Sequence, residues 1–168
     1  MGAADTEPLK RVAAECPGFQ ARATARSVTR YYNAYFKPLG LTAEQFSLLV
    51  GIGAAEGATL VDLAFSAGVD ATTLSRNVQN LESRGLVRAE GGRGRAGKRL
   101  GLTKSGRRLM VEALPVWKWA KAELARRMGD KKLRSAQRAM AELAEAAKAS
   151  SSAPPEPQES SRSYSRSK

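Results

Sequence analysis

The chain has 168 residues, a formal net charge of +12, no histidine and one cysteine. These counts exclude an intramolecular disulfide and any catalytic arrangement that needs histidine, and they argue against a zinc site, which prefers histidine and thiolate ligands. No run of about 18 apolar residues is present, and the N-terminal segment lacks the apolar core of a signal peptide, so we expect a cytoplasmic protein without a membrane span.

The charge is distributed unevenly along the chain. Residues 1–90 carry nine basic and nine acidic side chains, whereas residues 91–168 carry nineteen and seven. A basic half beside a neutral one favours a polyanionic partner, with nucleic acid first. A solvated, arginine-rich surface gives the same counts, so the order of the elements has to decide between the two interpretations.

The first third of the chain predicts an arm and two helices. Residues 1–14 are polar and weakly patterned, which indicates a flexible arm. A helix is expected over about 17–38, ending before Gly40. Thr42 and Gln45 have the spacing of a capping box, in which each side chain satisfies a free backbone N–H, so a second helix is expected to begin there.

Residues 60–85 predict two short helices joined by a tight turn, a helix-turn-helix. Gly68 permits the turn because glycine adopts a positive φ at little cost. Leu74, Val78 and Leu81 recur at i, i+4 and i+7 and are expected to face the core. The other faces of the second helix carry small and polar side chains: Thr72, Thr73, Ser75, Arg76, Gln79 and Asn80.

Residues 86–102 predict a β-hairpin, which we call the wing. Leu86–Glu90 and Arg99–Leu102 are its expected strands, and the loop between them is rich in glycine, which weakens strands. The wing also carries a group of cations: Arg93, Arg95, Lys98 and Arg99. A glycine-rich, cationic hairpin of this kind is typical of a surface that binds phosphates.

Two helices and a tail are expected after the wing. Thr103 should cap a long helix that runs to about Met128, in which Pro115 should produce a kink or a break. A last helix is expected from Asp130 to Lys148. Residues 150–168 form a low-complexity, serine-rich segment, which we expect to be disordered.

A helix-turn-helix followed directly by a basic hairpin suits duplex DNA. Small polar side chains let the second helix approach the major groove, where Arg76 can bond guanine or a phosphate. Gln79 and Asn80 can pair with adenine edges in the same groove. The wing cations can enter a minor groove or bind phosphates.

Several short segments match one protein family in order and without large gaps. They are Leu39-Gly-Leu-Thr42, Gln45-Phe46, Leu74-Ser-Arg76, Leu81-Glu-Ser-Arg-Gly-Leu-Val87 and Leu102-Thr-Lys-Ser-Gly106. On these segments, the stretch from about Cys16 to Met128 resembles the MarR-type winged-helix transcriptional regulators.

The resemblance implies a mainly α-helical fold with a small β-hairpin wing. A winged helix-turn-helix lobe would be joined to N- and C-terminal dimerisation helices (about 17–38 and 104–148) within one domain over 15–149. The expected partners are a second copy of the chain, as a homodimer, and double-stranded DNA with a pseudo-palindromic operator. The resemblance also implies release of DNA by a small aromatic effector or an oxidant, and it implies no cofactor, no metal and no enzymatic activity.

Two groups of residues are carried over with the resemblance. Thr72, Thr73, Ser75, Arg76 and Gln79 would line the major groove. Arg95 falls close to the wing arginine of the family, but Arg93 and Gly94 stand where the family usually has an acidic residue that supports the wing. This departure from the family pattern implies a wing that is less ordered without DNA and that binds DNA mainly through electrostatic attraction.

Cys16 is a candidate redox sensor, because a peroxide-sensing branch of the family has a reactive cysteine near the start of the first helix. An idle or buried thiol is the alternative that we favour, since free cysteines usually pack as small apolar residues. Tyr32, Phe36 and Trp117 are candidates for an effector pocket, with core and interface packing as the alternative.

The sequence thus predicts a sequence-specific, double-stranded DNA-binding transcriptional regulator, more readily a repressor than an activator. One alternative is a non-specific architectural DNA-binding protein, which would share the charge but have no preferred site. The other is a winged-helix protein-interaction module whose basic loop binds an acidic partner. An enzyme is the least favoured class, because the chain has no histidine and no phosphate-binding glycine loop before a Lys-Ser/Thr helix.

Overall fold

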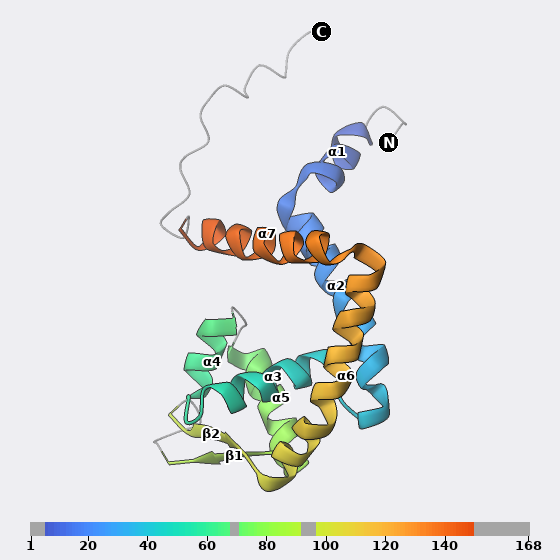
Figure 1. The fold of residues 1–168 in the computed structure, drawn as a ribbon. Coiled ribbons are helices and arrows are strands. Elements are labelled where there is room, and N and C mark those ends of the chain that lie inside the picture. Colours follow the sequence, from blue (N-terminus) through green and yellow to red (C-terminus); the bar gives the residue numbers. More distant parts are fainter. Residues whose placement is uncertain (1–5, 68–70, 92–96, 150–168) are drawn as a thin grey trace. The chain divides into compact units, whose positions relative to one another are not determined.

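The computed structural model describes residues 6–67, 71–91 and 97–149 and has seven α-helices and one hairpin in that part of the chain (Figure 1). The chain divides into two compact units, residues 1–121 and residues 122–168. The elements are α1 (Glu7–Glu15), α2 (Pro17–Phe36), a short 3-10 turn η2 (Lys37–Leu39), α3 (Ala43–Ala54), α4 (Leu60–Ala67), α5 (Ala71–Ser83), β1 (Val87–Glu90), β2 (Arg99–Leu102), α6 (Lys104–Met128) and α7 (Asp130–Ala149). The expected turn at Gly68, the wing residues Arg93 and Arg95, and the tail 150–168 lie outside the described residues.

The caps predicted from the sequence are confirmed. The Thr42 hydroxyl accepts a hydrogen bond from the Gln45 backbone at 3.1 Å, and the Gln45 side chain accepts one from the Thr42 backbone at 3.1 Å. The Thr103 hydroxyl accepts a hydrogen bond from the Gly106 backbone at 3.0 Å. Gly85, with φ of +66°, follows α5 in the left-handed conformation that glycine adopts most readily.

The core of the first unit lies where α2, α3, α5 and the hairpin meet. The predicted inward face of α5 is confirmed, because Leu74, Val78 and Leu81 are all buried. Phe36 of α2 stacks on Phe46 of α3 with ring centroids 4.4 Å apart. This packing holds α5 by one face and leaves its polar side chains at the surface.

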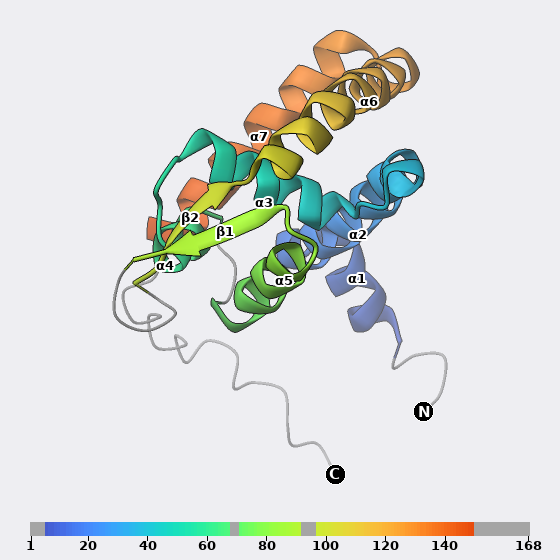
Figure 2. The ribbon, with the colours of Figure 1, turned by 90° about the horizontal axis from the view of Figure 1, so that it is seen from below.

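The wing is an antiparallel hairpin in which Val87 pairs with Leu102 and Glu90 with Arg99. Figure 2 shows the two strands side by side, with α5 next to them. The other edge of β2 is also paired, because the Leu100 backbone donates to the Ala58 carbonyl at 3.0 Å and its carbonyl accepts from the Gly57 backbone at 3.3 Å. The base of the wing is therefore fixed to the connection between α3 and α4.

Two features differ from the expectations. A nine-residue helix, α1, lies within the segment expected to be a loose arm. It buries none of its residues: Leu9 and Val12 lie one turn apart on it, but both are exposed. An Arg11–Glu15 ion pair at 3.1 Å supports the helix. The α6 helix continues through Pro115, so of the kink or break expected there the break is absent. Pro115 is exposed while Ala113 and Ala120 are fully buried, so packing on either side holds the helix together.

The second unit consists of the end of α6 and α7. Glu123 accepts hydrogen bonds from Arg126 at 2.8 Å and from Arg127 at 2.7 Å, and these bonds lower the pKa of its carboxyl to about 2. Met140 and Leu143 of α7 are large apolar side chains that remain exposed. None of the helices in the described part of the chain could span a bilayer.

Candidate functional site

The α5 helix presents a polar surface opposite its buried leucines. Thr72, Thr73, Arg76, Gln79 and Asn80 are exposed, and Ser75 is half-buried. Gln79 donates a hydrogen bond to the Ser75 hydroxyl at 3.2 Å. The Arg76 guanidinium makes no hydrogen bond or ion pair with the residues that the structure describes, so its charge is available to an external group.

Asn80 is placed differently from the other polar residues of α5. Its side-chain oxygen accepts a hydrogen bond from Gln45 at 2.9 Å, and Gln45 accepts one from Arg84 at 3.3 Å. Asn80 thus links the N-terminus of α3 to α5 in addition to facing solvent. Sequence reasoning missed this link because its two ends are 35 residues apart.

The two described wing cations have separate positions. Lys98 is exposed, whereas Arg99 donates to the Gly57 carbonyl at 3.3 Å and so fastens the wing to the α3–α4 connection. The neighbouring Asp62 accepts hydrogen bonds from the Thr59 backbone and hydroxyl at 2.9 and 2.7 Å. These bonds, with a smaller contribution from Arg99, lower the pKa of the Asp62 carboxyl. The Arg99 guanidinium, one of the wing cations, thus helps to hold the base of the wing in place.

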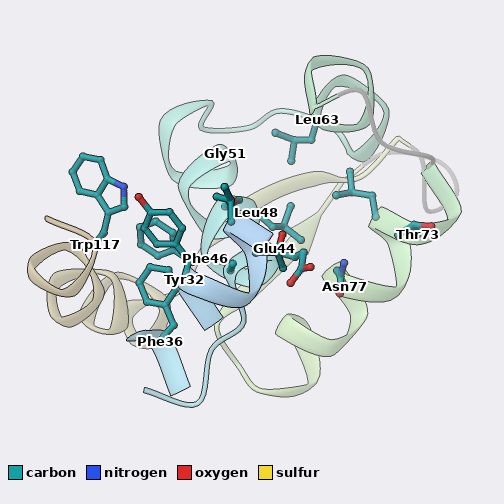
Figure 3. Close-up of a pocket in the computed structure, with 15 residues that line it drawn as sticks. Tyr32, Phe36, Glu44, Phe46, Leu48, Gly51, Leu63, Thr73, Asn77 and Trp117 are labelled. Atoms are coloured by element: carbon teal, nitrogen blue, oxygen red, sulfur yellow. The ribbon is translucent and has the colours of Figure 1, made fainter. Parts of the chain in front are cut away.

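A pocket of about 550 Å³ lies beside α5 in the first unit. It brings together the three candidate effector residues, Tyr32, Phe36 and Trp117, which come from α2 and α6. Figure 3 shows Trp117 and Tyr32 at one side and Thr73 and Asn77 of α5 at the other. Burial raises the pKa of the Tyr32 hydroxyl, so this group stays a neutral phenol at physiological pH.

Sequence reasoning missed the part of the pocket wall that α3 and α5 contribute. The residues concerned include Glu44, Phe46, Thr73, Leu74 and Asn77. Thr73 and Asn77 are one turn apart on α5, but helical spacing cannot show that this face borders a cavity.

Cys16 is half-buried between α1 and α2, where it occupies the N-cap position of α2 without a side-chain capping hydrogen bond. Tyr31, farther along α2, donates a hydrogen bond from its hydroxyl to the Ala120 carbonyl at 2.8 Å. The Tyr31 hydroxyl also lies 3.3 Å from the Tyr35 hydroxyl. These contacts assign Tyr31 to packing between α2 and α6. The redox role of Cys16 stays a prediction, with the idle thiol as the favoured alternative.

Comparison with known proteins gives consistent matches. The sequence model of the MarR family matches residues 39–96. The M. tuberculosis transcriptional regulator MosR is 36% identical, with 82% of this chain and 98% of that chain covered and a TM-score of 0.72. Its complex with DNA matches at 36% identity, 80% and 98% coverage and a TM-score of 0.71. Among curated protein sequences, none matches the chain.

The same fold recurs at lower identity. MarR from E. coli in its apo form is 23% identical, with 76% of this chain and 96% of that chain covered and a TM-score of 0.62. A half-exposed helix, a hairpin fixed beside it and flanking long helices define a winged helix-turn-helix protein. With the extent of the match to MosR, the chain belongs to the MarR family of transcriptional regulators. The predicted family and fold class are thereby confirmed.

Proposed function

We propose that the protein is a homodimeric repressor that binds a pseudo-palindromic double-stranded DNA operator and is released by a small aromatic effector. The observation that carries the proposal is the polar face of α5, on which Arg76 is exposed and has no partner among the described residues. The complex of the related MosR with DNA supports duplex DNA as the partner.

The α5 helix would enter the major groove by its polar face. Thr72, Thr73 and Ser75 are short, so the backbone can approach the bases, and Arg76 can reach a guanine edge or a phosphate. The wing would bind the flanking backbone through its cations, including Lys98. Because these contacts displace counterions, the affinity should fall steeply with salt.

A second copy of the chain would cover the exposed apolar residues of the terminal helices. On α7, Met140 and Leu143 have exposed fractions of 53% and 44%, and they continue a helical stripe that begins at the half-buried Leu133. Apolar stripes of this kind are usually buried against another helix. A dimer would present two α5 helices to DNA, which is the reason to expect a symmetric operator.

Release would follow from the position of the pocket. Thr73 and Asn77 belong to α5 and also line the pocket, so an occupant touches the helix that reads DNA. A ligand shifts the equilibrium only by its difference in affinity for the DNA-bound and free arrangements of α5. The pocket volume of about 550 Å³ suits a small aromatic molecule.

In vitro selection with the purified full chain, followed by footprinting, tests the proposal. A defined site with two half-sites about one helical turn apart is the expected result. Arg76→Ala should relax the base preference and cost about 1–3 kcal/mol if Arg76 reads a base. Arg138→Ala, an exposed arginine on α7, is the charge-matched control and should leave the preference unchanged.

The alternatives give different results in the same assay. Retention of DNA without any preferred site would favour an architectural protein. Absence of retention at moderate salt would favour a protein-interaction module. A footprint that Arg76→Ala leaves intact would refute the docking of α5.

A further inference from the structure

The charge of the pocket beside α5 defines the class of its ligand. Among the described residues that line it, Glu44 is the only charged one, and the rest are apolar, aromatic or neutral polar. Glu44 lies in the first turn of α3, is exposed on its solvent side, and makes no ion pair or hydrogen bond with any described residue. Figure 3 shows its carboxylate between the aromatic side of the pocket and Asn77.

We propose that this pocket takes an aromatic amine, with the ammonium group at Glu44 and the ring against Tyr32 and Trp117. This inference rests on the proposed function, in which an effector in the pocket controls DNA binding, and it adds the charge of that effector. An ammonium group matches the carboxylate, whereas a carboxylate ligand would bring two like charges close together.

The aromatic side of the pocket fixes the orientation of the ligand. The Lys121 ammonium lies 5.4 Å from the centre of the Trp117 ring, so a cation already occupies one face of that ring. A second cation would be repelled there, while an uncharged ring can pack against Trp117 and against Tyr32, whose ring is itself stacked on Phe36 with centroids 6.1 Å apart. The positive group of the ligand therefore belongs at the opposite side, near Glu44.

The amine position also explains how such a ligand acts on DNA binding. Asn77 lines the pocket on the α5 side and is half-buried, so its amide oxygen is an available second acceptor for an ammonium group. The residue after Glu44, Gln45, is hydrogen-bonded to Asn80 of α5 at 2.9 Å. A ligand drawn to Glu44 thus acts on α5 both directly, at Asn77, and through Gln45, which takes part in the capping box of α3.

Isothermal titration of the full chain with three matched probes tests the proposal: naphthylethylamine, naphthylethanol and naphthylacetate. The amine should bind about three- to fivefold more tightly than the acetate, which is the effect of an ion pair at an exposed carboxylate. Glu44→Gln should weaken the amine about three- to fivefold and change the neutral alcohol less than about twofold. Glu112→Gln, an exposed carboxylate on α6 outside the pocket, is the matched control and should change neither probe.

Three results would overturn the proposal: tighter binding of the acetate, an amine affinity that Glu44→Gln leaves unchanged, or no binding of the amine at millimolar concentration. Thermal midpoints of the two variants, measured alongside, show whether Glu44→Gln is folded. Operator binding of the same wild-type preparation without ligand is the separate readout of the proposed function. If DNA is retained and the amine fails, the ligand class is wrong while the regulator remains.

Discussion

Replacing Gly106 with alanine should destabilise the winged-helix unit. Gly106 is buried in the first turn of α6, against the residue that precedes β1. A Cβ at this position would overlap the carbonyl oxygen of Leu86 and lie 3.1 Å from its carbonyl carbon. Because both are backbone atoms, they cannot rotate away as a flexible side chain would, so α6 would have to move.

The size of the effect follows from the bonds that this movement weakens. The Thr103 backbone donates to the Leu86 carbonyl at 3.1 Å, and the Thr103 hydroxyl donates to the Gly85 carbonyl at 2.6 Å. Overpacking costs about 1–3 kcal/mol, and each weakened hydrogen bond about 0.5–1.5 kcal/mol. The better helix propensity of alanine offsets about 1 kcal/mol. A net loss of about 1–5 kcal/mol should lower the Tm by roughly 2–20 °C in a chain of this size.

Urea and thermal unfolding followed by circular dichroism measure this loss, at one protein concentration because the proposed dimerisation would make the midpoint depend on concentration. Gly18→Ala is the matched control, since Gly18 also lies in a helix and its added Cβ would meet only the Arg22 side chain at 3.5 Å and the Cys16 sulfur at 3.9 Å. That variant should be more stable than wild type by up to about 1 kcal/mol. A Gly106→Ala midpoint equal to or above that of wild type would refute the reasoning.

The remaining predictions concern α5, the second unit and the dimer. Asn80→Ala should lower DNA affinity evenly across operator variants, because its side chain braces α3; competition with single-base operator variants checks this, and a preference lost at one base pair would contradict it. The pKa of Glu123 is lowered from 4.5 to about 2, so its contribution to stability is present above pH 4.5 and is lost as the pH falls towards 2. Thermal midpoints of wild type and Glu123→Gln should therefore converge over that interval, and a constant gap would argue against the ion pairs. Met140→Glu combined with Leu143→Glu should give a monomer in light scattering, whereas Ser135→Glu, off the apolar stripe, should not; a dimer that survives the double substitution would place the interface elsewhere.

The local conformation of this protein is largely determined by its sequence. The caps at Thr42 and Thr103, the left-handed Gly85 and the buried stripe of α5 depend on residues within about a turn of each other. Helical and strand patterns therefore predicted the order of the elements and the hairpin, while the resemblance of several short segments indicated the family. Short-range patterning did not show that the apolar side chains of α1 stay exposed, and it left open whether Pro115 would kink or break α6, which continues through that residue.

The tertiary structure decided which distant residues act together. Tyr32 and Trp117 line one pocket, Asn80 is bonded to Gln45, and Arg99 is bonded to the α3–α4 connection, and none of these pairs is close in sequence. Spacing along the chain sets which side chains share a helix face, but it carries no information on what lies opposite that face. What lies opposite a helix face depends on how the helices pack. Packing places Glu44, one of many surface carboxylates, at the wall of the pocket beside α5.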